Sequence, residues 1–80
     1  MNDFNAAIQF YNKCIELNPK FVPVYKQKGN ILNELRMYAA AIQCFDIAIS
    51  LNPLDTEALY NKGYILRKLN DFKGAIQCFE

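Results

Sequence analysis

The sequence contains no histidine and no tryptophan, and only three cysteines, three glycines and three prolines among 80 residues. Serine and threonine occur once each, as Ser50 and Thr56. A chain with no histidine, almost no hydroxyl nucleophiles and no glycine-rich phosphate loop lacks the groups from which most catalytic sites are assembled. The composition therefore argues against an enzyme, and we expect no cofactor.

The three cysteines are Cys14, Cys44 and Cys78, an odd number whose spacings match neither a disulfide framework nor a zinc site. We expect free thiols, which are typical of the reducing interior of a cell, and no bound metal. Polar residues interrupt the first fifteen positions, so the sequence predicts no signal peptide, and no apolar run approaches the roughly 18 to 20 residues of a membrane-spanning helix. These observations predict a cytoplasmic protein with no membrane partner.

The charges nearly cancel, because nine basic and eight acidic side chains leave a formal net charge of +1. Proteins that bind nucleic acid through the phosphate backbone concentrate positive charge instead, so we expect no nucleic-acid partner. Hydrophobic residues make up 52% of the chain and charged residues 21%, which is a globular composition for one small domain.

Short segments recur at a fixed interval of 34 residues, which is the strongest signal in the sequence. Ala7-Ile8-Gln9 returns at residues 41–43 and again at residues 75–77, and Leu17-Asn18-Pro19 returns at residues 51–53. Two aromatic series follow the same step; they are Phe4, Tyr38, Phe72 and Tyr11, Phe45, Phe79. The chain is therefore built from repeats of one structural unit.

Apolar residues within each repeat follow helical rather than strand spacing, as between Tyr38 and Ile49. Proline restricts the residue before it, so Asn52 should end a helix ahead of Pro53, while Pro23 suits a first helical turn and Asp55 or Thr56 can cap the next helix. The sequence predicts helices over 3–17, 23–36, 38–51 and 56–69, and a fifth, shorter one over 72–80.

A two-helix unit of this length and pattern resembles the tetratricopeptide repeat. Residues 22–55 carry the family's signature positions in order: Tyr25, Gly29, Leu32, Ala41, Phe45, Ala48 and Pro53. The resemblance implies an all-α fold, a right-handed superhelix of antiparallel helices, divided into a partial repeat (2–21), a complete repeat (22–55) and an incomplete one (56–80). One departure is that Lys28 and Lys62 stand where the family usually has an aliphatic residue.

Glycine inside a helix costs about 1 kcal/mol relative to alanine, so Gly29 should mark a close helix contact. We expect Ala41 to press against its backbone while Phe45 fills the adjacent space. The cysteines are interpreted as packing residues, with Cys14 in the small buried position that Ala48 occupies one repeat later.

Residues that differ between copies on a shared scaffold are the candidates for binding. Lys26, Asn30 and Asn33 follow helical spacing on one helix, and one period later their places are taken by Tyr60, Tyr64 and Arg67. In the family that the chain resembles, the first helix of each repeat lines a concave groove that grips a peptide of a partner protein. The resemblance thus implies a protein-interaction scaffold whose groove residues are Lys26, Asn30, Asn33, Tyr60, Asn61, Tyr64 and Arg67.

Two alternatives remain open at this point. Lys26, Asn30 and Asn61 resemble half of the carboxylate clamp with which some such domains bind the acidic C-terminal tails of heat-shock chaperones. The chain also starts and stops within a helical pair, which predicts a fragment of a longer repeat protein and self-association through exposed terminal helices. A helical-repeat RNA reader fits less well, because its usual period is about 35 and the charge balance is unfavourable.

Overall fold

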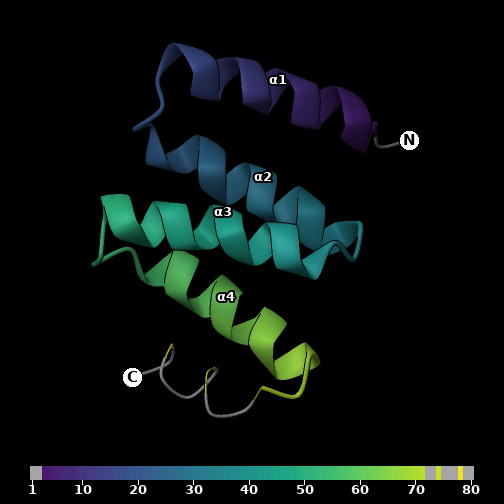
Figure 1. The fold of residues 1–80 in the computed structure, drawn as a ribbon, viewed down its shortest axis with the longest axis vertical. Helices are drawn as coiled ribbons and strands as arrows, with labels where there is room; N and C mark the ends of the chain where they lie inside the picture. Colours follow the sequence, from purple (N-terminus) through teal and green to yellow (C-terminus); the bar gives the residue numbers. More distant parts are fainter. Residues whose placement is uncertain (1–2, 72–73, 75–77, 79–80) are drawn as a thin grey trace.

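The computed structural model describes residues 3–71, 74 and 78, which form four α-helices and no strand within that part of the chain. The helices are α1 (Phe4–Leu17), α2 (Val22–Glu34), α3 (Tyr38–Leu51) and α4 (Thr56–Lys68), joined by short turns so that neighbours run antiparallel (Figure 1). The all-α prediction is confirmed, and the predicted helix ends agree to within two residues. The fifth predicted helix falls on residues 72–80, which, apart from Gly74 and Cys78, lie outside the described residues.

Aspartate side chains begin two of these helices. Asp3 Oδ1 accepts a hydrogen bond from the Ala6 amide at 3.0 Å, and Asp55 Oδ1 accepts one from the Ala58 amide at 3.1 Å. Each bond satisfies a backbone donor that has no partner within the first helical turn. Asp55, rather than Thr56, is therefore the cap of α4, while α2 carries Pro23 in its first turn.

The helices end in two different ways that alternate along the chain. Asn18 and Asn52, each before a proline, leave the helical region with φ near −147° and −144°, as the sequence predicted. After α2 and α4 the chain instead turns through Arg36 and Asn70, with φ of 62° and 64°. The Met37 amide bonds back to the Leu32 carbonyl at 2.9 Å, the six-to-one contact of a Schellman motif, which satisfies the last carbonyls of α2.

The core is centred on α3, which packs between α2 and α4. Ala41, Phe45 and Ala48 on this helix have no exposed surface, and Cys44 is buried beside them. A Cβ built on Gly29 would lie 2.8 Å from Phe45 Cζ, and its three nearest neighbours all belong to that ring. The expected close contact at Gly29 is thus present, and the atoms nearest to it belong to the Phe45 ring.

In contrast, α1 packs against α2 alone among the described helices and buries none of its side chains completely. Cys14 is half-buried, so it is not the fully buried counterpart of Ala48 that the repeat pattern predicted. Tyr25 stabilises the turn between α1 and α2, because its hydroxyl donates a hydrogen bond to the Pro19 carbonyl at 2.6 Å. No helix of the described residues is both long and apolar enough to cross a membrane.

Candidate functional site

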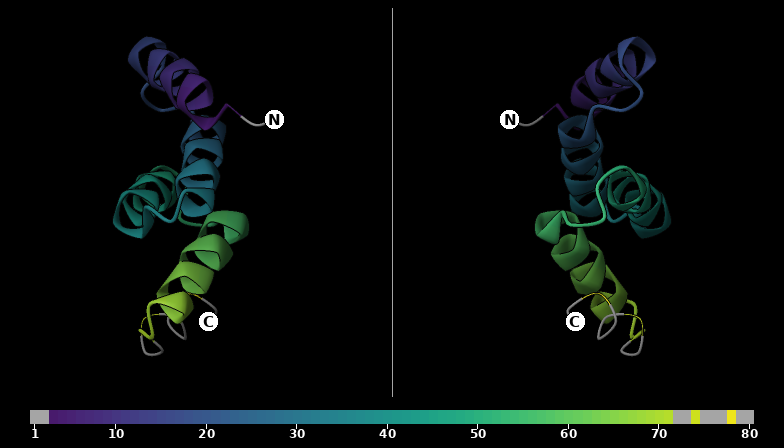
Figure 2. Two further views of the ribbon diagram at one scale, coloured as in Figure 1. Left: turned by 90° about the vertical axis from the view of Figure 1, so that its right-hand side faces the viewer. Right: turned by 90° about the vertical axis from the view of Figure 1, so that its left-hand side faces the viewer.

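The first helices of the two repeats, α2 and α4, follow one another along one side of the molecule, with α3 set to the other side (Figure 2). The seven residues selected from the sequence lie on these two helices. Their side chains are exposed or half-buried, so none of the seven belongs to the fully buried core. We call the surface that they form the α2–α4 face.

Lys26 is held at one end of this face by two carboxylates at the beginning of α4. Its Nζ lies 2.9 Å from Asp55 Oδ2 and 3.6 Å from Glu57 Oε2. The hydrogen bond to Asp55 is the main reason why the pKa of Lys26 is raised, and the same bond lowers the pKa of the Asp55 carboxyl. Sequence reasoning assigned Asp55 to helix capping alone, but it both caps α4 and joins α2 to α4.

The asparagines form the middle of the α2–α4 face. The Asn61 amide nitrogen donates to Asn30 Oδ1 at 3.2 Å, which brings together two residues that the sequence placed on different repeats. Asn33 lies one turn further along α2, and its buried Oδ1 accepts no hydrogen bond from the part of the chain that is described. Asn30 is exposed and uses its oxygen in this bond, so its amide nitrogen is the group best placed to meet a peptide backbone.

Two tyrosines provide the exposed apolar surface of α4. Tyr60 and Tyr64 are 53% and 51% exposed, and their rings stack with centroids 6.5 Å apart and planes at 29°. Such rings combine a large flat contact area with low conformational freedom, which is why tyrosine is frequent in binding surfaces. Arg67, the last of the predicted residues, is exposed near the C-terminal end of the same helix.

A polar pocket of about 460 Å³ lies at the far end of the face and was not predicted. It is lined by Asn33, Glu34, Arg36, Tyr38 and Lys68. The Lys68 Nζ lies 5.8 Å from the centre of the Tyr38 ring, within the range of a cation–π interaction. Comparing the copies could have identified Glu34 and Lys68 as candidates, because these two residues occupy equivalent positions one period apart and differ.

Comparison with known families finds a repeat of the same 34-residue length: the model of the tetratricopeptide repeat matches residues 10–43 and again residues 44–77. The chain belongs to the tetratricopeptide repeat family. Repeats of this family are protein–protein interaction modules.

Solved structures of this repeat type superimpose closely. Two crystal structures of the protein MamA each align with 98% of this chain, with TM-scores of 0.95 and 0.93 and 22% sequence identity. This structural similarity establishes the fold. The N-terminal domain of stress-induced protein-1 from C. elegans aligns with 86% of the chain at a TM-score of 0.81 and 28% identity. The chain spans 46%, 43% and 60% of these three chains. A search of curated proteins found no match.

Proposed function

We propose that this tetratricopeptide repeat chain is a non-catalytic scaffold that binds a peptide segment of a partner protein on the α2–α4 face. The observation that carries the proposal is the arrangement of the stacked, half-exposed Tyr60 and Tyr64 beside the Asn30–Asn61 hydrogen bond. The rings supply apolar contact area, and the neighbouring amides can pair with the backbone of an extended peptide.

Lys26 has a secondary role in this proposal. Its ammonium is already paired with Asp55 and Glu57, so a carboxylate of a ligand would have to displace them. Binding of an acidic chaperone tail, as in the carboxylate clamp, is therefore the less favoured form of the same function. Arg67 and Lys68, toward the other end of α4, are better placed to meet an acidic residue of a ligand.

The test is a selection of twelve-residue peptides from a random library on the full 80-residue chain, followed by titration of the selected peptides. Replacing Tyr60 or Tyr64 by alanine should weaken binding tenfold or more, because truncating an aromatic anchor commonly costs about 2 kcal/mol or more of binding free energy. Phe10→Ala on α1, which also removes an exposed ring, is the matched control and should leave binding unchanged.

Two results would contradict the proposal: no peptide is selected, or the tyrosine variants bind as tightly as the original chain. An acidic C-terminal peptide and its amidated form are titrated alongside. A clear preference for the free carboxylate that is lost in Lys26→Ala would instead support the clamp.

Self-association is a second candidate function, favoured by exposed apolar side chains on α1. Phe10 and Leu17 are 65% and 81% exposed, and they project from a helix that packs on one neighbour only. Sedimentation across a concentration series tests this candidate, because a mass that stays at the 9.2 kDa of one chain at every concentration would exclude it. We also propose a cytoplasmic location, supported by three cysteines that remain free thiols.

A further inference from the structure

Two interfaces of the chain are related by the 34-residue period: α1 against α2, and α3 against α4. In the second interface, Lys62 Nζ lies 2.6 Å from Asp46 Oδ1. One period earlier the lysine is present as Lys28, but Asn12 stands in the place of the aspartate. No carboxylate of the described residues lies within ion-pair distance of the Lys28 ammonium. The α1–α2 interface thus contains the lysine, Lys28, but lacks the carboxylate that would pair with it.

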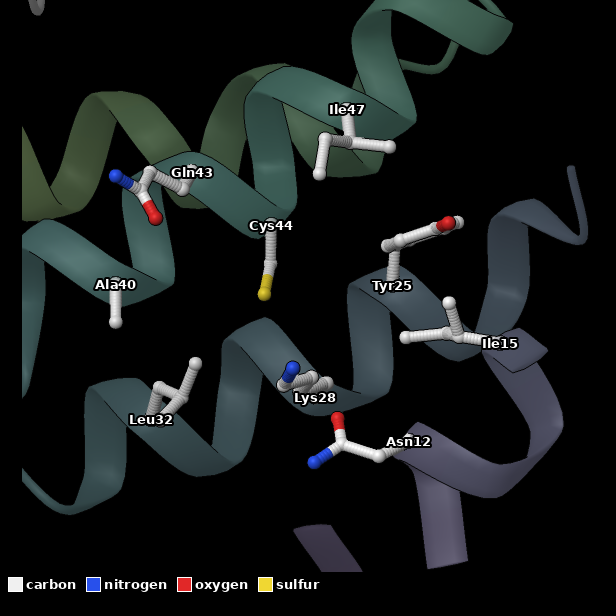
Figure 3. Close-up of a pocket in the computed structure, with 9 residues that line it drawn as sticks. All are labelled: Asn12, Ile15, Tyr25, Lys28, Leu32, Ala40, Gln43, Cys44 and Ile47. Atoms are coloured by element: carbon white, nitrogen blue, oxygen red, sulfur yellow. The ribbon is translucent and has the colours of Figure 1, made fainter. Parts of the chain in front are cut away.

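Lys28 and Asn12 line a pocket of about 430 Å³ between α1, α2 and α3, into which the Cys44 thiol also points (Figure 3). Its remaining walls are mostly apolar; they are Ile15, Tyr25, Leu32, Ala40, Gln43 and Ile47. The Tyr25 hydroxyl is occupied by its bond to the Pro19 carbonyl, so the ammonium of Lys28 and the amides of Asn12 and Gln43 are the polar groups that remain for a ligand.

This combination favours one kind of occupant. A half-buried ammonium beside apolar walls forms a charge-assisted hydrogen bond with a carboxylate, and the two amides can donate to the same group. Ile15, Leu32 and Ile47 favour a bulky apolar group attached close to that carboxylate. A volume of about 430 Å³ is at the small end of ligand pockets, and it suits one or two large side chains better than a whole folded partner.

We propose that this pocket is a second peptide site, which takes a partner segment in which aspartate or glutamate stands next to a bulky apolar residue. The ligand carboxylate occupies at Lys28 the position that Asp46 occupies at Lys62. The apolar side chain packs against Ile15 and Ile47. Because Lys28 and Leu32 lie on a different face of α2 from Lys26 and Asn30, the site does not rest on the function proposed for the α2–α4 face.

The experiment is a nuclear magnetic resonance titration of the full, isotope-labelled chain. The probes are acetylated and amidated glycine–serine octapeptides with a central Glu-Leu or Glu-Phe pair, and matched peptides with glutamine in place of glutamate. We expect chemical-shift changes at Asn12, Lys28 and Ile47, and about tenfold tighter binding of the glutamate peptides.

Two variants test whether the Lys28 ammonium binds the carboxylate of the peptide. Asn12→Asp supplies the missing carboxylate on the protein itself, and Lys28→Gln removes the positive charge; each should weaken binding about tenfold. Asn12 is exposed, so Asn12→Asp leaves the packing intact, and circular dichroism verifies the fold of both variants. Lys62→Gln, the equivalent change in the other interface, is the matched control and should bind as the original chain does.

The proposal is overturned if the glutamine peptides bind equally, if Asn12→Asp retains full affinity, or if no peptide binds. It is also overturned if the shifts appear at Tyr60 and Tyr64 instead, which would assign the peptides to the other face. Octanoate is titrated in parallel. Saturation of the pocket by octanoate without binding of any peptide would identify a site for small carboxylic acids instead of a peptide site.

Discussion

Helices α1 and α3 begin from nearly the same sequence pattern and reach different degrees of burial. Both carry the Ala-Ile-Gln triplet, followed four residues after its alanine by an aromatic ring, Tyr11 in α1 and Phe45 in α3. Phe45 has no exposed surface, whereas Tyr11 is half-buried. The difference arises from the neighbours, because α3 packs between α2 and α4 while α1 packs on α2 alone.

Burial in a repeat protein therefore depends on how many neighbours a unit has as much as on its own residues. The same ring position can be fully buried in one copy and only half-buried in another. Stability should consequently be distributed unequally along this chain, with α3 contributing most and α1 least. Three groups of variants test this distribution.

The largest effect is expected for Phe45→Ala, compared with Tyr11→Ala. Removing a fully buried ring should cost about 3 to 5 kcal/mol, because a cavity remains between α2 and α3. The half-buried Tyr11 should cost about 1 kcal/mol. Urea denaturation followed by circular dichroism gives both values. Equal losses would show that α1 is as firmly packed as α3.

An intermediate effect is expected for Gly29→Ala. The added methyl would stand 2.8 Å from Phe45 Cζ in a tightly packed interface, so the variant should lose about 1 to 3 kcal/mol although alanine favours the helix. Phe45→Leu shortens the opposing side chain and serves as the second arm of a double-mutant cycle. If the two changes add without coupling, the Phe45 ring is not the group that excludes a side chain at Gly29.

A smaller effect is expected at the two aspartate caps. Asp3→Ala should cost about 1 kcal/mol as a lost cap, and Asp55→Ala should cost more, because Lys26 also loses the nearer of its two carboxylate partners. Asp55→Asn retains a cap acceptor and removes the ion pair alone. Thermal unfolding of the three variants separates the two contributions, and equal costs for Asp3 and Asp55 would contradict the role of the Lys26 pair.

The ion pair also predicts a pH dependence. Because the pKa of Asp55 is lowered by folding, its contribution is fully present above the unfolded value of about 3.9 and is lost as the pH falls through the folded pKa. The stability difference between the original chain and Asp55→Asn should therefore shrink in acid. A difference that stays constant down to the lowest accessible pH would show that the pair adds nothing.

Much of the fold could be predicted because its signals are local. The helical spacing of apolar residues and the prolines after Asn18 and Asn52 act over a few residues, and the 34-residue period repeats these local signals; each agrees with the structure. The turns at Arg36 and Asn70 could not be predicted in the same way, because the left-handed conformation there is usually taken by glycine.

The candidate site was less predictable because it depends on contacts between repeats. The residues selected by comparing the copies lie outside the fully buried core, and the structure brings Asn30 and Asn61 into contact. The comparison of copies could not show that Asp55 pairs with Lys26, or that Lys28 lacks a carboxylate partner because residue 12 is asparagine. Each of these contacts lies between two different helices. Whether the seven selected residues bind a partner remains the prediction that the peptide selection tests.

The contacts between α2 and α4 have a mechanical consequence. Lys26 is bonded to the beginning of α4, and Asn30 is bonded near its middle, while the two helices diverge toward their C-terminal ends (Figure 1). Helices α2 and α4 are therefore held together at their N-terminal ends and lie further apart at their C-terminal ends, where the polar pocket lies. Salt or acid that weakens the Lys26 ion pairs would loosen the end at which α2 and α4 are held together, so the angle between these two helices would be less firmly set.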